Sequence, residues 1–177
     1  MTFLLITLLM VVVFMLVGCS SDIKAVTNPD LPLPTDKEQL PTYLKHFISK
    51  EYTDYDITID ASSNVEGSYL VDLELFSDKI SEEKALNLAR DFVFATFKAS
   101  QINNLPIDYS AVNIQTPEGK RVLLVGVGSD VIKKIDLDTL KNGSMDAYDF
   151  AQWLELNKNQ NIIEGKTYYN GRCVIIR

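Results

Sequence analysis

Apolar and polar residues alternate along four short stretches of the chain beyond residue 35. This period of two is typical of strands that bury one face. The first two stretches are separated by a turn around 64–68 and the last two by Thr116-Pro117-Glu118-Gly119. The pattern therefore predicts two hairpins, with strands at 55–60, 69–75, 109–115 and 121–127.

A helical pattern precedes each predicted hairpin. From about Gln39 to Lys50 the apolar residues recur at i, i+3, i+4 and i+7, which predicts a short amphipathic helix. The second helix is predicted over 81–99, with Ser81 as its N-cap and Glu82 and Glu83 in the first turn. Its apolar side chains cover an arc of roughly 200°, wide for a helix on one sheet. Phe94 falls outside that arc, among polar residues, and is expected to be exposed.

The order helix, hairpin, helix, hairpin suggests an internal repeat. Glu66-Gly67 corresponds to Glu118-Gly119 at an offset of 52 residues, and the second strands of the hairpins match at the same offset. The first strands match better at an offset of 55, which a three-residue difference in turn length would explain. Few identities support the comparison, so a tandem αββ repeat and a chance similarity both stay open.

The remaining chain predicts two helices and a hairpin. The helices are expected over 129–141 and from Ser144 to Asn157, and the hairpin joins 162–169 to 172–176 through Asn170-Gly171. The predicted fold is thus α+β, an antiparallel sheet with helices packed on one face, in a single domain over 36–177.

The beginning of the chain has a different pattern. Phe3 to Val17 is continuously apolar, and as a helix it would be ~22 Å long, shorter than the ~30 Å hydrocarbon core of a bilayer. This length is typical of the apolar region of a signal peptide. Leu16-Val17-Gly18-Cys19 at its end resembles the lipobox of bacterial lipoproteins, in which an apolar residue, a tolerant position and a small residue precede cysteine.

The resemblance implies that the Cys19 thiol is joined to a diacylglyceryl group, and that a peptidase recognising Leu16, Val17 and Gly18 then removes residues 1–18. The Pro-rich residues 19–35 would tether the domain to the outer face of the cytoplasmic membrane. The lack of Lys or Arg near Met1 departs from this pattern, which suggests a weak signal or a start upstream. An uncleaved anchor helix is the alternative.

Charge and cysteine content limit the partners. The formal net charge of −7 argues against nucleic acid, which needs basic patches. If Cys19 carries lipid, only Cys173 remains, so no internal disulfide forms. Cys173 lies in a predicted strand and is expected to be a buried small hydrophobe, with an intermolecular bridge or a reactive thiol as alternatives.

Recognisable catalytic and metal-binding patterns are missing from the sequence. His46 is the only histidine, and neither a nucleophile elbow nor a Gly-rich phosphate loop is present. The acidic stretch at 136–143 fails the spacing of a calcium loop, since Leu140 and Lys141 occupy the ligand and glycine positions. No catalytic residue, metal or cofactor is therefore predicted. Asp72 and Glu74 are the acids that a wall hydrolase would use.

Three residues are candidates for partner contact. Gly126 and Gly128 alternate with core positions of a strand, where glycine often marks close approach by another backbone. This backbone belongs either to the last helices or the tail hairpin, or to a partner protein that docks on the glycines. Phe94 is the other candidate for contact with a partner. The favoured function is a non-enzymatic envelope lipoprotein that binds a protein or peptide. Inhibition of an envelope enzyme, binding of a small ligand and wall hydrolysis are the alternatives.

Overall fold

The computed structural model describes residues 32–48, 51–137, 145–163, 166–170 and 172–175. Leu33–Arg177 forms one compact unit. Its elements, in chain order, are α2 Leu40–Ile48, β1 Ile57–Ser63, β2 Tyr69–Phe76, α3 Glu82–Asn103, β3 Ile107–Gln115, β4 Arg121–Gly128, α4 Ser129–Ile132, α6 Ala147–Asn157, β5 Asn159–Ile163, β6 Lys166–Asn170 and β7 Arg172–Ile175.

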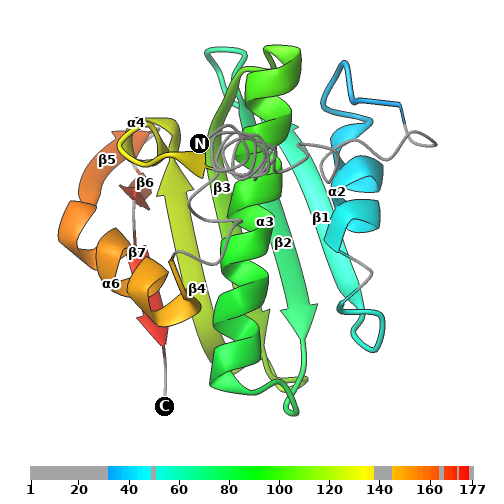
Figure 1. Ribbon diagram of the computed structural model, residues 1–177, viewed down its shortest axis with the longest axis vertical. Coiled ribbons are helices and arrows are strands. Elements are labelled where there is room, and N and C mark those ends of the chain that lie inside the picture. The colour runs from blue at the N-terminus through cyan, green and yellow to red at the C-terminus, as the bar shows by residue number, and fades with distance from the viewer. Residues whose placement is uncertain (1–31, 49–50, 138–144, 164–165, 171, 176–177) are drawn as a thin grey trace, which may run out of the picture. The chain divides into compact units, whose positions relative to one another are not determined.

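The main sheet has five strands in the order β1-β2-β3-β4-β7 (Figure 1). The two predicted hairpin pairs, β1–β2 and β3–β4, are antiparallel as expected, and β4–β7 is antiparallel as well. The central pair β2–β3 is parallel, because α3 returns the chain to the end of the sheet at which β2 began. The sheet is therefore mixed but mostly antiparallel, and the predicted α+β class is confirmed.

Helices α2, α3 and α6 pack on one face of the sheet, with α3 between the other two (Figure 1). The central place of α3 explains its wide apolar arc, since it contacts strands below and a helix on either side. Phe94 is only 3% exposed, and its ring centroid lies 6.3 Å from that of Phe47 in α2. The expected exposure of Phe94 is wrong because the sequence does not show which helix flanks α3.

The predicted boundaries of α3 are close to those observed. The Ser81 side chain accepts a hydrogen bond from the Lys84 backbone N–H, as expected for an N-cap. At the other end, Asn104 adopts a left-handed conformation with φ 52°, which ends the helix. The helix spans 22 residues and runs along the strands of the main sheet (Figure 1).

The two hairpins have the same turn. In each turn, the backbone N–H of a glycine donates a hydrogen bond to the backbone carbonyl three residues earlier. Gly67 donates to Asn64, and Gly119 donates to Thr116. Gly67 and Gly119 have φ of +82° and +84°, a region that favours glycine. The turns thus match a type I turn followed by a G1 bulge, and the order α2-β1-β2-α3-β3-β4 repeats αββ.

One detail of the expected repeat is wrong. Ile59 lies opposite Leu73 and Val112 lies opposite Val125, so the first strands correspond at an offset of 53 residues (59 to 112), not 55. The turns do not differ in length, and the shift comes from a bulge in β4 at Val122. Offsets of 53 and 55 place the same side chains on the same face, so alternation alone could not separate them.

The C-terminal part differs from the prediction. Strand β6 pairs with β5, whereas β7 leaves this hairpin and pairs with β4. The predicted hairpin joining 162–169 to 172–176 is therefore wrong, although Asn170-Gly171 is a strong turn signal. By pairing with β7, the apolar strand β4 loses its open edge.

The two helices predicted before this hairpin are shorter than expected. The helix predicted over 129–141 is observed only as α4, and residues 138–144 lie outside the described part. Helix α6 is capped by Asp146, whose side chain accepts from the N–H groups of Tyr148 and Asp149. The predicted cap, Ser144, also lies outside the described residues.

The core fills the space between the helices and the sheet. Its largest fully buried side chains come from every layer, which fixes the position of each helix. They are Leu40, Leu44, Leu73, Leu75, Leu86, Leu88, Phe92, Ile114, Leu123, Phe150 and Leu154.

Candidate functional site

The lipobox residues Leu16, Val17, Gly18 and Cys19 lie outside the described residues. Within the described part, no helix is long and apolar enough to cross a membrane. The second cysteine, Cys173, lies in β7 opposite Val125, a core residue with 0% exposure.

The three predicted contact residues do not form one exposed surface. Phe94 is buried in the helix layer, whereas Gly126 and Gly128 lie in β4. Both glycines are buried as well. Their paired neighbours explain part of this burial, since Gly126 lies between Ala111 and Arg172 in the sheet, and Gly128 pairs with Tyr109. Two other surfaces are better candidates for a functional site: a cleft beside α3 and the face of the sheet opposite the helices.

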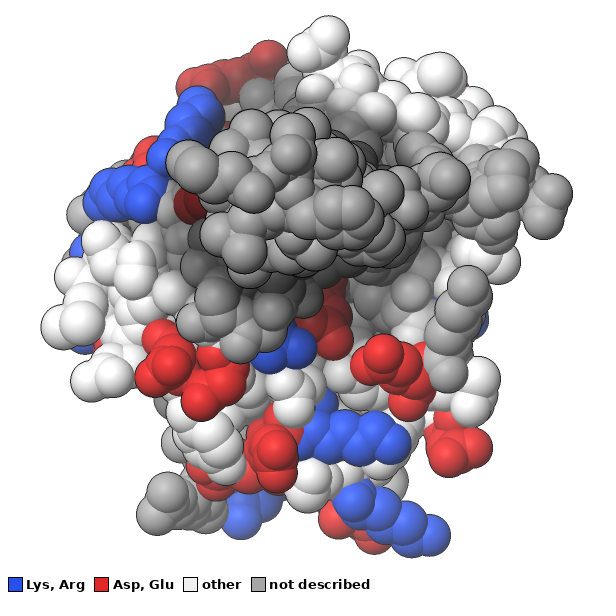
Figure 2. All heavy atoms as spheres, viewed as in Figure 1, with Lys and Arg blue, Asp and Glu red and all other residues white. Residues whose placement is uncertain are grey.

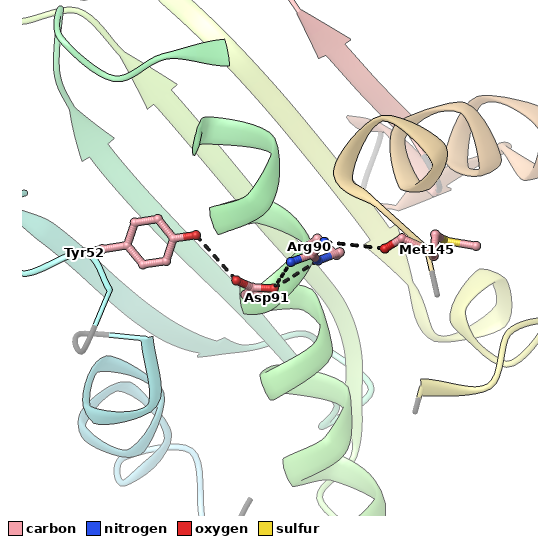
Figure 3. A network of polar contacts seen from close by, with 4 residues as sticks. All are labelled: Tyr52, Arg90, Asp91 and Met145. Carbon is pink, nitrogen blue, oxygen red and sulfur yellow. Dashed lines mark hydrogen bonds and ion pairs between the residues drawn. The ribbon is translucent and has the colours of Figure 1, made fainter. Parts of the chain in front are cut away.

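A polar cleft of about 420 Å³ lies beside the first half of α3. Its central contact is the carboxylate of Asp91, which accepts hydrogen bonds from Arg90 at 2.9 and 3.0 Å and from the Tyr52 hydroxyl at 3.4 Å (Figure 3). Arg90 also donates to the backbone oxygen of Met145 at 3.5 Å. The residues lining the cleft are Glu51, Tyr52, Ser81, Glu83, Lys84, Asn87, Arg90 and Asp91.

Four of the side chains that line this cleft, Tyr52, Lys84, Arg90 and Asp91, contact one another. The Lys84 ammonium lies 4.8 Å from the centroid of the Tyr55 ring and 5.9 Å from that of Tyr52. Burial raises the pKa of Tyr52, and the nearby Asp91 carboxylate adds to this shift. Burial also raises the pKa of Asp91, against the effect of Arg90. These contacts hold the segment before β1, through Tyr52, and the segment before α6, through Met145, against α3.

The face of the sheet opposite the helices is the second candidate. No helix of the described residues lies on this face (Figure 1). On the opposite side, which carries the helices, the space-filling view shows acidic and basic side chains interspersed (Figure 2). The positions that alternate with the core in β1, β2, β3 and β4 define what we call the open face. Its residues are Thr58, Asp60, Ser62, Leu70, Asp72, Glu74, Phe76, Tyr109, Ala111, Asn113, Gln115, Val122 and Leu124.

Acidic residues gather at the β1–β2 side of the open face. Asp60 lies directly opposite Asp72, and Glu74 follows two residues further along β2. Burial raises the pKa of Asp72, and the carboxylates of Glu74 and Asp60 raise it further. Like charges placed directly across a strand pair are destabilising. The opposed pair Asp60–Asp72 thus costs stability, in contrast to Asp91, which is paired with Arg90.

A large aromatic side chain lies on the same strand. Phe76 is 51% exposed at the end of β2, and Asn113 in β3 has a buried side-chain oxygen for which no hydrogen-bond partner is found. Asn113 is adjacent to Glu74 in the β2–β3 pairing. The open face thus combines an exposed aromatic side chain with acidic groups.

Among the described residues, no group of three or more His, Cys, Asp or Glu side chains is arranged to hold a metal ion. Asp60, Asp72 and Glu74 form an acidic surface on the open face. The sequence placed Asp60, Asp72 and Glu74 on outward faces of strands. It did not reveal that Asp60 and Asp72 are directly opposed, because that depends on the register of the hairpin.

No family model, curated protein or solved structure matches the chain.

Proposed function

We propose that this protein is a lipid-anchored lipoprotein of the bacterial cell envelope, and that its domain binds a protein or peptide through the open face. The lipobox-like Leu16-Val17-Gly18-Cys19 supports the anchor. The observation that carries the binding role is the open face itself, a sheet surface with no helix of the described residues on it (Figure 1).

A macromolecular partner suits this surface better than a small molecule does. Small-molecule sites are concave and enclose most of the ligand surface. The open face is made of flat strand positions, among them exposed Phe76 and the acids Asp60 and Glu74. An exposed aromatic with charged groups around it is typical of a protein contact surface.

The direct test places a photo-crosslinking amino acid at single positions of the full chain in living cells. Glu74 and Phe76 report on the open face, and Gln152 in α6, which is also exposed, is the control on the helix side. We expect one envelope protein to be captured from Glu74 and Phe76 and not from Gln152. Equal capture from Gln152, or no specific capture from either open-face position, would contradict the proposal.

A further inference from the structure

The first strand of the sheet leaves one edge open. β1 is the end strand of the order β1-β2-β3-β4-β7, and within the described part of the chain it pairs only with β2. Its seven residues pair with β2 in continuous register, without a bulge. An open edge exposes a row of backbone N–H and C=O groups that can pair with another strand.

Natural sheets usually protect such an edge. Proline, lysine, a bulge or a very short strand are common protections, and β1, with the sequence Ile-Thr-Ile-Asp-Ala-Ser-Ser, has none of them; its one charged residue is Asp60. Helix α2 contacts β1 and buries Ile57 and Ile59 on the helix side. The side chains of Thr58, Asp60 and Ser62 on the open face are exposed. An added strand would therefore meet the acidic part of the open face.

The charges disfavour a second copy of this chain as the added strand. In a symmetric antiparallel β1–β1 pair, the residues of the open face must lie opposite one another. Asp60 of one copy would then lie opposite Asp60 of the other, or one diagonal step away, and Asp72 of each copy would be close by. Like charges at these distances repel, so the edge favours a strand of opposite charge.

We propose that an extended basic segment of a partner protein adds to β1 as a further strand, with its Lys or Arg side chains on the open face beside Asp60. This inference rests on the proposed function and names the chemistry of the partner. Backbone hydrogen bonds to β1 would supply affinity. The pair Asp60–Asp72 would supply charge selectivity, because a cation beside it relieves the repulsion of two neighbouring carboxylates.

The first experiment measures peptide binding to the purified full chain in detergent by fluorescence anisotropy. The probe is a capped, labelled peptide with the sequence Lys-Val-Lys-Val-Lys-Val-Lys, which presents all its lysines on one face of a strand. We expect it to bind with an affinity that falls as salt is added. The same peptide with Glu in place of Lys should not bind.

Charge variants locate the contact. A cross-strand ion pair contributes ~0.2–1 kcal/mol, so D60N should weaken binding of the lysine peptide by a factor of about 1.4 to 5. D60K should weaken it more and should allow the glutamate peptide to bind. E118K makes the same change in net charge at a fully exposed site in the turn between β3 and β4, and should leave both affinities unchanged. Equal losses in D60K and E118K would overturn the proposal, because they indicate general charge attraction.

Backbone methylation tests whether a strand is added. In an extended peptide, the N–H groups of the lysines point to one edge and those of the valines to the other. Only one of these edges can face β1. We therefore expect methylation of one set of amides to abolish binding and methylation of the other set to leave it largely intact. Equal behaviour of the two methylated peptides would overturn strand addition.

A neutral variant separates a binding edge from an edge that is merely guarded against self-association. If D60T forms dimers in sedimentation experiments and the unmodified chain does not bind the lysine peptide, Asp60 only prevents pairing of copies, and the inference fails. The cellular crosslinking through Glu74 and Phe76 is independent of this result. Capture there without peptide binding would leave the proposed function standing while removing the basic strand.

Discussion

At the scale of single residues, Asp72 is an acid in an unfavourable position. Its pKa is raised, first by burial and then by Glu74 and Asp60. The folded state therefore holds the Asp72 proton more tightly than the unfolded state does. The stability contributed by Asp72 is full below the unfolded pKa, near 3.8, and is lost as the pH rises through the higher folded pKa.

The variant D72N tests this linkage, since asparagine keeps the shape and removes the charge. At pH 7 we expect D72N to be more stable than the unmodified chain by ~0.5 kcal/mol, the range of a cross-strand charge effect. The difference should vanish near pH 2.5, well below the unfolded pKa, where Asp72 is protonated in both states. Urea unfolding at the two pH values measures it, and a stabilisation that does not change with pH would show that the charge is not its cause.

Phe94 provides a second residue-scale prediction. Its ring is buried between α3 and α2 beside Phe47. Truncation of a buried phenylalanine removes apolar burial and leaves a cavity, so F94A should lower the free energy of unfolding by ~3 kcal/mol. The matched control is F76A, where the same truncation at a half-exposed side chain should change stability by about 0.5 kcal/mol or less. Comparable losses in both variants in urea unfolding would contradict the buried position of Phe94.

At the scale of elements, the repeated hairpins predict repeated energetics. Gly67 and Gly119 have nearly the same positive φ, and nothing lies within 4 Å of a Cβ added at either position. Alanine would therefore meet no atoms but would be strained by the backbone conformation. G67A and G119A should each lower the free energy of unfolding by ~1 kcal/mol. V65A at an exposed position of the first turn is the control. A clear difference between the two glycine variants would argue against equivalent turns.

The elements also show how far the sequence carries a prediction of this fold. Local signals were sufficient for most boundaries: Ser81 marked the start of α3, and alternation marked β1 to β4. Pairing over a long distance was not predicted. The parallel contact of β2 with β3, and the pairing of β7 with β4 instead of β6, depend on how whole elements pack, and no local pattern encodes them.

The candidate site was only partly predictable for the same reason. Alternation in β1 and β2 placed Asp60, Asp72 and Glu74 on an outward face. That this face carries no described helix, and that β1 is an edge strand, follows only from the arrangement of the complete sheet. Phe94 shows the opposite error, because a helical wheel treats one side of α3 as solvent that α2 in fact covers.

At the scale of the whole molecule, the proposed anchor determines where the open face can act. Each buried CH₂ contributes ~0.8 kcal/mol, so two acyl chains would hold the domain on the membrane, whereas one chain gives only reversible binding. A tether over 19–35 with three prolines would be extended, at ~3.1 Å per residue. The open face would then meet partners within several tens of ångströms of the bilayer surface.

The two cysteines make the anchor testable with a matched pair of variants. In cells fed an alkyne fatty acid, the unmodified chain and C173A should both incorporate the label. C19A should lose it and should retain residues 1–18 in its intact mass, because in lipoproteins lipid is attached before the signal is cut. If C173A loses the label and C19A keeps it, the lipid is attached to Cys173, which would contradict the proposed anchor at Cys19. An unlabelled, uncut chain in all three cases would establish residues 3–17 as a permanent anchor, and the open face would still be held at the membrane by a different segment.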